Sequence, residues 1–416
     1  IKMIYIDPPY NTGKDFVYKD DFHDNIKNYK EITKQTTKAN TETSGRFHTD
    51  WLNMMYPRLK LARNLLREDG VIFISIDDNE TSNLRKICDE IFGEDNFISQ
   101  VTRIAKTTSF RGNYFAPSKD YILCYAKNIS ELPNFVDTNV DKSQFPKVEE
   151  SGPRKGEYYR DDIAFYLSTL ETRPNQRYFI ECPDGSKVLP PGTTFPPEKP
   201  VDGDGVWRWN YETFQEKKDL IVFKRTNRSP LIDENGNQAK WNLYTKSYLK
   251  DKMAKGNIPR DYFEGFLNRN GKETLKKLNI PFDFAKPVQL IKYLMQISLV
   301  ENEDIVLDFF SGSATTAEAV MQLNAEDNGN RKFIMVQLPE LTDEKSEAYK
   351  AGFKNICEIG KERIRRAGDK IIEETGKTDL DIGFKVFKLD SSNVKTWDPD
   401  FDNLEQTLFD LQDNIK

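Results

Sequence analysis

The stretch Ile4-Tyr5-Ile6-Asp7-Pro8-Pro9-Tyr10 joins an apolar run to a carboxylate, two prolines and an aromatic ring. The apolar run predicts a buried strand. The prolines predict a stiff turn after it, because proline fixes φ and removes a backbone donor. The carbonyls and the Asp7 carboxylate would then form a rigid group of hydrogen-bond acceptors beside a flat ring, which suits a planar substrate with an NH2 group, such as a nucleobase. A strand-to-turn connection without function is the alternative explanation.

Apolar runs elsewhere in the chain extend this strand into a sheet. Helical spacing of apolar residues alternates with short, continuous apolar runs, which is typical of an α/β fold with a parallel sheet. The expected strands are 71–76, 121–125, 305–310 and 333–336, and the expected helices are 51–66, 84–92, 288–299 and one that begins at Ala317. The polar segment 14–50 has little periodicity and predicts a long loop.

Composition narrows the class of protein. The chain has 416 residues, of which 31% are charged, and a net charge of −6, so a water-soluble protein of two or three domains is expected. No apolar run approaches the roughly 18 residues of a membrane span. Four separated cysteines and only two histidines predict no disulfide framework and no metal centre, and they favour a cytoplasmic location. Because Ile1 already lies in a predicted strand, we expect the chain to be a fragment.

The middle of the chain has a different texture. Between positions 221 and 260 there are nine basic and three acidic residues, interleaved with Trp241, Tyr244 and Tyr248. Cations meet phosphates and rings stack on bases, so this pattern favours nucleic-acid contact; a solvated charged face is the alternative. A second basic stretch precedes the strand at 121–125, where phosphate contact and a solvated loop are equal alternatives. The predicted DNA contacts are Arg103, Lys106, Arg111, Lys224, Arg225 and Lys246.

A possible cofactor site lies in the stretch Asp308-Phe309-Phe310-Ser311-Gly312-Ser313, between a strand and a helix. Small residues allow a ligand to approach the backbone closely at a helix N-terminus. The turn lacks the GxGxxG pattern of dinucleotide sites, so a nicotinamide cofactor fits poorly. Asp308 at the strand end better suits a ligand with a cationic amino group and a ribose. Structural packing without a ligand is the alternative.

Together, Asp7-Pro8-Pro9-Tyr10 and Asp308–Ser313 resemble the catalytic and cofactor motifs of DNA methyltransferases that modify amino groups. The order of catalytic motif, insert and cofactor motif is similar to the β-class. Four further stretches resemble the Mod subunit of type III restriction-modification systems. They are Tyr10-Asn11-Thr12-Gly13, Trp51-Leu52-Asn53-Met54-Met55-Tyr56-Pro57-Arg58-Leu59, Ile74-Ser75-Ile76-Asp77-Asp78-Asn79-Glu80 and Gly383-Phe384-Lys385-Val386-Phe387.

The resemblance implies a Rossmann-like α/β sheet that binds S-adenosylmethionine, with an inserted mixed α+β target-recognition domain. The implied domains are a catalytic half (1–128), the insert (129–282), a cofactor-binding half (283–390) and an acidic tail (391–416). The implied catalytic residues are Asp7, Pro8, Pro9 and Tyr10. The implied cofactor contacts are Asn11, Lys286, Asp308, Phe309, Phe310, Ser311, Gly312, Ser313, Gln337 and Glu340, and either of the last two could hold the ribose.

The expected reaction is methylation of the N6 amine of a flipped adenine in double-stranded DNA. By the resemblance, an aspartate at the first motif position favours adenine N6 over cytosine N4. A Mod homodimer and a restriction (Res) subunit are the implied partners. The alternatives are a non-catalytic recognition subunit that directs a partner nuclease-helicase, and a methyltransferase that acts on protein glutamine or RNA. Ala314 stands where the wider family often has glycine, and we expect the extra methyl group to be tolerated.

Overall fold

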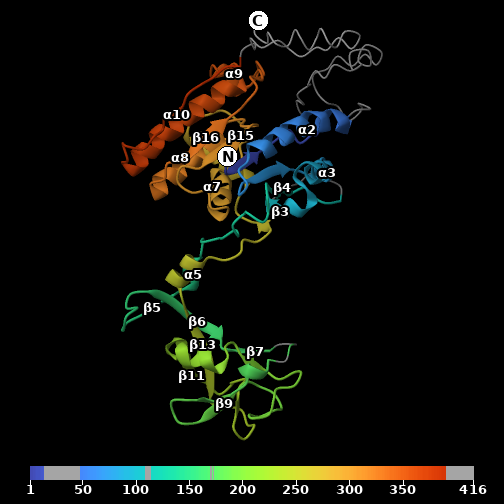
Figure 1. The fold of residues 1–416 in the computed structure, drawn as a ribbon. Helices are drawn as coiled ribbons and strands as arrows, with labels where there is room; N and C mark the ends of the chain where they lie inside the picture. The colour runs from blue at the N-terminus through green and yellow to red at the C-terminus, as the bar shows by residue number, and fades with distance from the viewer. Residues whose placement is uncertain (14–46, 108–113, 169–170, 172, 390–416) are drawn as a thin grey trace, which may run out of the picture.

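The structure is a computed structural model, and it describes residues 1–13, 47–107, 114–168, 171 and 173–389 (Figure 1). Seven strands form the main sheet in the order β14-β3-β4-β2-β1-β15-β16. Their bounds are Met3–Ile6 (β1), Val71–Ile76 (β2), Phe97–Ile104 (β3), Lys119–Ala126 (β4), Tyr262–Phe263 (β14), Ile305–Asp308 (β15) and Lys332–Met335 (β16). All five strands expected from the sequence are therefore present in one sheet.

The sheet is mixed, which corrects the expectation of a parallel one. β2, β1, β15 and β16 run parallel to one another, but β4 is antiparallel to both β2 and β3. β3 and β4 follow one another in the sequence without an intervening helix, and such a short connection joins antiparallel strands. The parallel half, which carries both predicted motifs, agrees with the expected Rossmann-like arrangement.

Helices cover both faces of the parallel strands. Ile4 and Ile6 of β1 pack in one core with α2 (Phe47–Leu65) and α3 (Thr81–Phe92). Met3 and Tyr5 face the other core, with α7 (Val288–Ile297) and α8 (Thr315–Asp327). Successive side chains of a strand point to opposite faces, and burial on both faces explains why the strand is apolar throughout.

A further helix lies outside this pair of layers. α10 (Ile356–Thr375) packs against α8 through a core that includes Ala317, Met321 and Ile364. The sequence analysis did not predict this helix, because its apolar positions are separated by charged residues over its whole length. The short α9 (Glu347–Lys350) precedes it. No helix within the described segments is long and apolar enough to cross a membrane.

The insert has its own core and lies below the sheet in Figure 1. Phe165, Trp207 and Leu243 are fully buried at its centre. A four-stranded sheet has the order β11-β13-β6-β5. A two-stranded sheet pairs β10 with β7, and a three-stranded sheet has the order β12-β9-β8. The strands are β5 Lys147–Val148, β6 Tyr158–Ala164, β7 Tyr166–Leu167, β8 Ile180–Glu181, β9 Lys187–Leu189, β10 Val206–Trp207, β11 Ile221–Arg225, β12 Ile232–Asp233 and β13 Trp241–Tyr248, with helices α4 Tyr211–Glu216 and α5 Leu249–Lys255.

The insert ends earlier in the chain than the expected boundary at 282. Its two connections to the main sheet meet at Asp137 and Asn257, whose backbones exchange hydrogen bonds of 2.8 and 2.9 Å. Beyond this neck, β14 pairs with β3 in the main sheet. The next helix, α6 (Asn268–Lys277), places Leu275 in the core beside α8 and α10. Residues 262–282 therefore pack with the main sheet and its helices.

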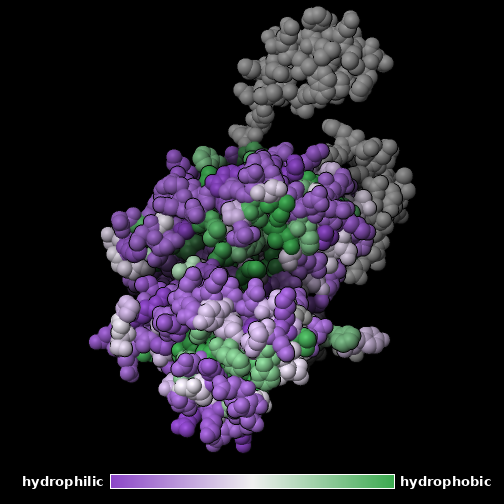
Figure 2. Space-filling model, turned by 60° about the horizontal axis from the view of Figure 1, so that its bottom comes forward, coloured by the Kyte–Doolittle hydropathy of each residue, from purple (hydrophilic) through white to green (hydrophobic). Residues whose placement is uncertain are grey.

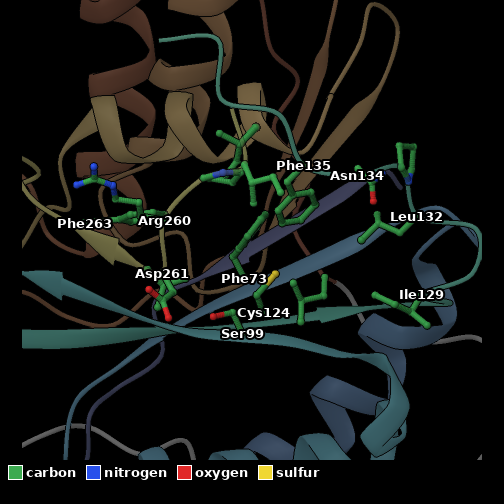
Figure 3. A pocket seen from close by; sticks show the side chains of 16 residues that line it. Phe73, Ser99, Cys124, Ile129, Leu132, Asn134, Phe135, Arg260, Asp261 and Phe263 are labelled. Atoms are coloured by element: carbon green, nitrogen blue, oxygen red, sulfur yellow. The ribbon is translucent and has the colours of Figure 1, made fainter. Parts of the chain in front are cut away.

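A hollow separates the insert from the main sheet. Figure 2 shows hydrophobic side chains gathered in this hollow, with polar surface on either side of it. A cavity of about 430 Å³ lies at the neck, lined by residues that include Phe73, Cys124, Phe135, Ile258 and Phe263 (Figure 3). None of the site residues predicted from the sequence lines this cavity. The candidate site is therefore elsewhere.

Candidate active site

The two predicted motifs meet at one edge of the sheet. β1 and β15 are parallel neighbours, with Met3 opposite Val306 and Ile4 opposite Leu307. From this pair the chain continues to β2 on one side and to β16 on the other. Connections that leave in opposite directions open a crevice at the carboxyl ends of the two strands, where ligands bind in open α/β sheets. Asp7 and Asp308 stand at this crevice.

Asp7 is held by a lysine that lies 279 positions later in the chain. Lys286 Nζ donates to Asp7 Oδ1 at 2.6 Å and to Oδ2 at 2.7 Å, and to the Tyr10 hydroxyl at 2.7 Å. The same ammonium lies 4.9 Å from the centroid of the Tyr10 ring. Burial, followed by the charge of Asp7, holds the pKa of Tyr10 well above its ordinary value, so its hydroxyl stays protonated. The acceptor cluster expected from the sequence thus holds an amine.

A tryptophan of helix α2 holds the turn after β1 in place. Trp51 Nε1 donates to the Pro9 carbonyl at 2.7 Å, and the Trp51 side chain is fully buried. This bond uses the Pro9 carbonyl. Within the described segments, the Pro8 carbonyl has no such donor. The sequence predicted a helix that begins at Trp51, and the structure gives this residue a role in the turn as well.

Asn11 supports the turn through its side chain, and its contact with the cofactor stays a prediction. The residue is 1% exposed. Its amide donates to Glu80 Oε1 at 2.5 Å and to the Phe47 carbonyl at 3.1 Å. Glu80 is fully buried and also bonds to His48 at 2.6 Å. Glu80, in the stretch that resembled a family motif, therefore holds Asn11 and His48 beside the turn after β1.

Asp308 is enclosed by its own turn. Its carboxylate accepts from the Phe310 backbone N–H at 3.1 Å and from the Thr316 hydroxyl at 2.7 Å. Burial raises the pKa of Asp308 to about 7, against the lowering effect of these hydrogen bonds, and the charge of Asp7 adds to the rise. A cation placed here would favour the ionised carboxylate. The site therefore fits a ligand with a positively charged group.

The small-residue turn is close-packed between two strands. Gly312 has φ of 49°, and its N–H donates to Gln337 Oε1 at 2.8 Å. Gln337 Nε2 donates to Glu340 Oε1 at 3.1 Å, so the two candidate ribose ligands lie together. Ala314 also has a left-handed φ, 62°. A left-handed residue with a Cβ is strained, which gives a physical reason for the glycine often found there in the family.

The other predicted cofactor residues lie in the same turn. Phe309 and Phe310 pack ring against ring, with centroids 5.4 Å apart, and Phe310 is 6% exposed. Ser311 donates its backbone N–H to Val336 at 3.3 Å. Ser313 is buried. The turn thus brings these residues to the crevice, although Phe310 and Ser313 face packed surroundings.

The sequence analysis missed Arg363, which braces this turn from α10. Its side chain is fully buried and pairs with Glu318 at 2.7 Å. It also donates to the Ser313 hydroxyl at 2.9 Å and the Thr315 hydroxyl at 2.7 Å. Gly360, one turn earlier on α10, lets the helix approach the carbonyl of Gly312. An arginine among other charged residues on a helix carried no signal of this role.

Arg103 is a second correction, because it is not a surface residue. Its guanidinium is fully buried and donates to Asp120 Oδ1 at 2.7 Å. It also donates to the Phe266 carbonyl at 2.6 Å and to Asn268 at 2.9 Å, on the chain that returns from the insert. A guanidinium used in this way cannot meet a DNA phosphate, and the prediction for Arg103 was wrong. Lys106 is exposed, and Arg111 lies outside the described residues.

The basic residues predicted in the insert lie on its four-stranded sheet. Lys224 donates to Asp161 Oδ1 at 3.0 Å and lies 4.6 Å from the ring centroid of Tyr244. Lys246 pairs with Glu149 at 2.5 Å. Arg225 at the end of β11 is exposed. The basic run seen in the sequence is therefore partly neutralised by carboxylates from other strands, and Arg225 stays a predicted DNA contact.

The strand order, the acceptor cluster and the small-residue turn together define an α/β methyltransferase-like protein with an inserted domain. A family model described as DNA methylase matches residues 1–365, and the chain belongs to this family. The methyl donor of this family is S-adenosylmethionine. Asp308, Gly312 and the Gln337–Glu340 pair fit such a group, since a buried carboxylate of raised pKa accepts a cationic ligand and hydroxyl-binding oxygens lie nearby.

Curated relatives include Mod subunits of type III restriction-modification enzymes. The chain is 34% identical to the EcoPI Mod subunit of Escherichia phage P1 over 93% of its length, and 33% identical to the EcoP15I Mod subunit of Escherichia coli over 94%. It spans 61% and 62% of those two relatives. It is also 32% identical to the type II methyltransferase M.KpnI of Klebsiella pneumoniae, over 89% of this chain and 82% of that protein.

Proposed function

We propose that the protein transfers a methyl group from S-adenosylmethionine to the N6 amine of an adenine in double-stranded DNA. In this proposal it is the modification and recognition subunit of a restriction-modification system in the prokaryotic cytoplasm. The observation that carries it is the arrangement at the sheet edge. The acceptors of Asp7 already hold an amine, and the turn of the neighbouring strand β15 stands beside them.

The residues of the turn after β1 suit an exocyclic amine. The lone pair of an adenine N6 amine is delocalised into the ring, so the amine is a poor nucleophile. Asp7 and the Pro8 carbonyl would accept its two hydrogens and favour a more tetrahedral nitrogen, while the Tyr10 ring stacks on the base. The Asp7 carboxylate would receive the proton that the amine loses when the N–C bond forms. S-adenosylmethionine supplies an already activated methyl group, so positioning accounts for most of the remaining rate.

The cofactor would be held by the turn after β15. Asp308 would face its cationic part, the backbone near Gly312 would allow close approach, and Glu340 would accept from the ribose. We favour Glu340 over Gln337 for the ribose, because the Gln337 oxygen already accepts from the Gly312 N–H at 2.8 Å. Gln337 would then orient Glu340 through their 3.1 Å contact.

The insert would read the DNA sequence. A base inside a duplex cannot reach the Asp7 cluster, so the target adenine has to be flipped out. Lys106, just after β3, and Arg225, on the insert, are exposed basic residues, and they would contact phosphates. We extend the proposal to a homodimer and to a restriction subunit as partner, because the relatives at about one-third identity are Mod subunits.

Expression of the complete chain in a host without DNA methylation tests this function. DNA from these cells is digested to nucleosides, and N6-methyladenine and N4-methylcytosine are measured by mass spectrometry. We expect N6-methyladenine with the wild type and none with Asp7→Asn, which keeps the size of the side chain. N4-methylcytosine alone would overturn the choice of base. Specific DNA binding without either product would instead support the non-catalytic recognition subunit.

A further inference from the structure

All three N–H donors of the Lys286 ammonium are hydrogen-bonded to the motif Asp7-Pro8-Pro9-Tyr10. A lysine has three N–H donors, and Lys286 directs them to the two oxygens of Asp7 and to the Tyr10 hydroxyl. The side chains of Lys286 and Asp7 are only 10% and 25% exposed. Motif resemblance assigned this lysine to the cofactor. Its observed partners belong to the base-binding motif instead.

The backbone of Lys286 is set by two helices. It stands just before Pro287, which caps the N-terminus of α7, and α7 buries Val288 and Ile291 against the sheet. On the other side, α6 packs closely on the same stretch. A Cβ on Gly271 would lie 2.2 Å from the Ala285 carbonyl and 2.9 Å from that of Lys286. Glycine at 271 therefore allows the contact that fixes the base of the lysine side chain.

The positive charge of Lys286 also offsets the negative charge of Asp7 at this edge of the sheet. Asp7 and Asp308 end neighbouring strands, and the charge of Asp7 contributes to the raised pKa of Asp308. Without a nearby cation, the partly buried Asp7 carboxylate would carry an uncompensated desolvation cost, and its side chain could rotate out of the site. Lys286 is the described cation that contacts Asp7. It therefore holds the Asp7 carboxylate in place and links it to the Tyr10 hydroxyl.

We infer that Lys286 is a positioning residue for the methyl-accepting amine, and that its main role is not to bind the cofactor. It holds Asp7 and Tyr10 in the arrangement that the base needs, and its ammonium marks the place where the N6 amine enters. This inference rests on the proposed function, because it assumes an amine substrate at Asp7.

The pairing itself is tested without any activity. Lysines of the wild type and of Asp7→Asn are labelled by reductive dimethylation, and the rates are measured by mass spectrometry. We expect Lys286 to react about tenfold faster in Asp7→Asn, since a lost charge pair is worth about 1.4 kcal/mol, which is tenfold. Lys292 lies on the nearby helix α7 and pairs with Glu326, so its rate serves as the internal reference. Equal Lys286 rates in the two proteins would overturn the inference.

The role is tested with Lys286→Met, Lys286→Arg and the matched control Lys292→Met. Unmethylated genomic DNA is the substrate, and binding of S-adenosylhomocysteine is measured by calorimetry. We expect Lys286→Met to lower kcat about 100-fold, the scale of a misplaced catalytic group, with the Kd for S-adenosylhomocysteine changed less than threefold. Lys286→Arg, which keeps the charge, should recover part of the loss, and Lys292→Met should behave as wild type.

Two results separate failure of the inference from failure of the proposed function. If the Kd for S-adenosylhomocysteine rises as much as kcat falls, Lys286 serves the cofactor and the inference is wrong. If the wild type methylates no DNA, the proposed function fails. The labelling rates then decide alone whether Lys286 holds Asp7. Thermal unfolding of Lys286→Met, compared with the wild type, shows whether the variant is folded.

Discussion

Asp308 ends strand β15, Asp7 follows the adjacent parallel strand β1, and the charge of Asp7 affects the pKa of Asp308. Burial raises the pKa of Asp308 to about 7, and the charge of Asp7 contributes in the same direction. The two groups thus have different surroundings although they stand at one edge of the sheet. Lys286 compensates Asp7, whereas Asp308 accepts only from an N–H and a hydroxyl among the described residues. A cationic ligand would complete this second site.

The stability of the protein should depend on pH through Asp308. Between the ordinary value of 3.8 and about 7, the folded protein holds a proton that the unfolded chain has released. The contribution of Asp308 to the free energy of unfolding is therefore present below this range and falls by on the order of 1.4 kcal/mol per pH unit as the pH rises through it. Urea unfolding of the wild type and Asp308→Asn from pH 5 to 8 measures this. Plotted against pH, the free energies of unfolding of the two proteins should have different slopes below about pH 7 and similar slopes above it. Equal slopes throughout would contradict the prediction.

Cofactor binding should release a proton near neutral pH. A cationic group beside Asp308 lowers the pKa of its carboxyl group, so up to about one proton leaves on binding. Calorimetry with S-adenosylhomocysteine at pH 6.5, in two buffers of different ionisation enthalpy, counts the protons. Asp308→Asn, which cannot ionise, should abolish most of this release. An unchanged proton count in the variant would place the cation away from Asp308.

Loss of Arg363 should destabilise the turn after β15, because Arg363 on α10 holds Ser313 and Thr315 in place. Arg363→Met leaves Glu318 as a buried, unpaired charge, which costs about 3 to 5 kcal/mol. The matched control is Arg365→Met, because Arg365 lies on the same helix with a 55% exposed side chain. Chemical unfolding gives the stability, and titration with S-adenosylhomocysteine gives the affinity. Glu318→Gln should restore part of the stability of Arg363→Met; a double variant as unstable as the sum of the two would contradict the pairing.

Removal of Arg225 should weaken DNA binding in a salt-dependent way. If this exposed arginine neutralises one phosphate, Arg225→Gln lowers the slope of log K against log salt by about 0.9. Lys224→Gln should change the slope less, because Lys224 is already paired with Asp161. Fluorescence anisotropy with duplex DNA from 50 to 200 mM salt is the measurement, and Lys86→Gln on α3 is the control. An unchanged slope for Arg225→Gln would remove the insert sheet from the DNA interface.

The local sequence determined the strands and both motifs. Continuous apolar runs such as 71–76 predict strands buried on both faces, because the pattern follows from burial and needs no knowledge of neighbours. The acceptors of Asp7-Pro8-Pro9-Tyr10 and the small-residue turn at Gly312 were also evident, since proline and glycine act on the backbone next to them. The match of the family model to residues 1–365 confirms the class that these motifs indicated.

Pairing between distant residues was decided only by the tertiary structure. Motif resemblance assigned Lys286 to the cofactor and a basic stretch assigned Arg103 to DNA, whereas the sequence carried no signal for Arg363. The fold places a carboxylate beside each of them, Asp7, Asp120 and Glu318, and so gives each a different role. A buried cation needs a partner that the sheet and helices bring from far along the chain. For that reason the sequence could show which residues carry charge, and only the fold could show which charges meet.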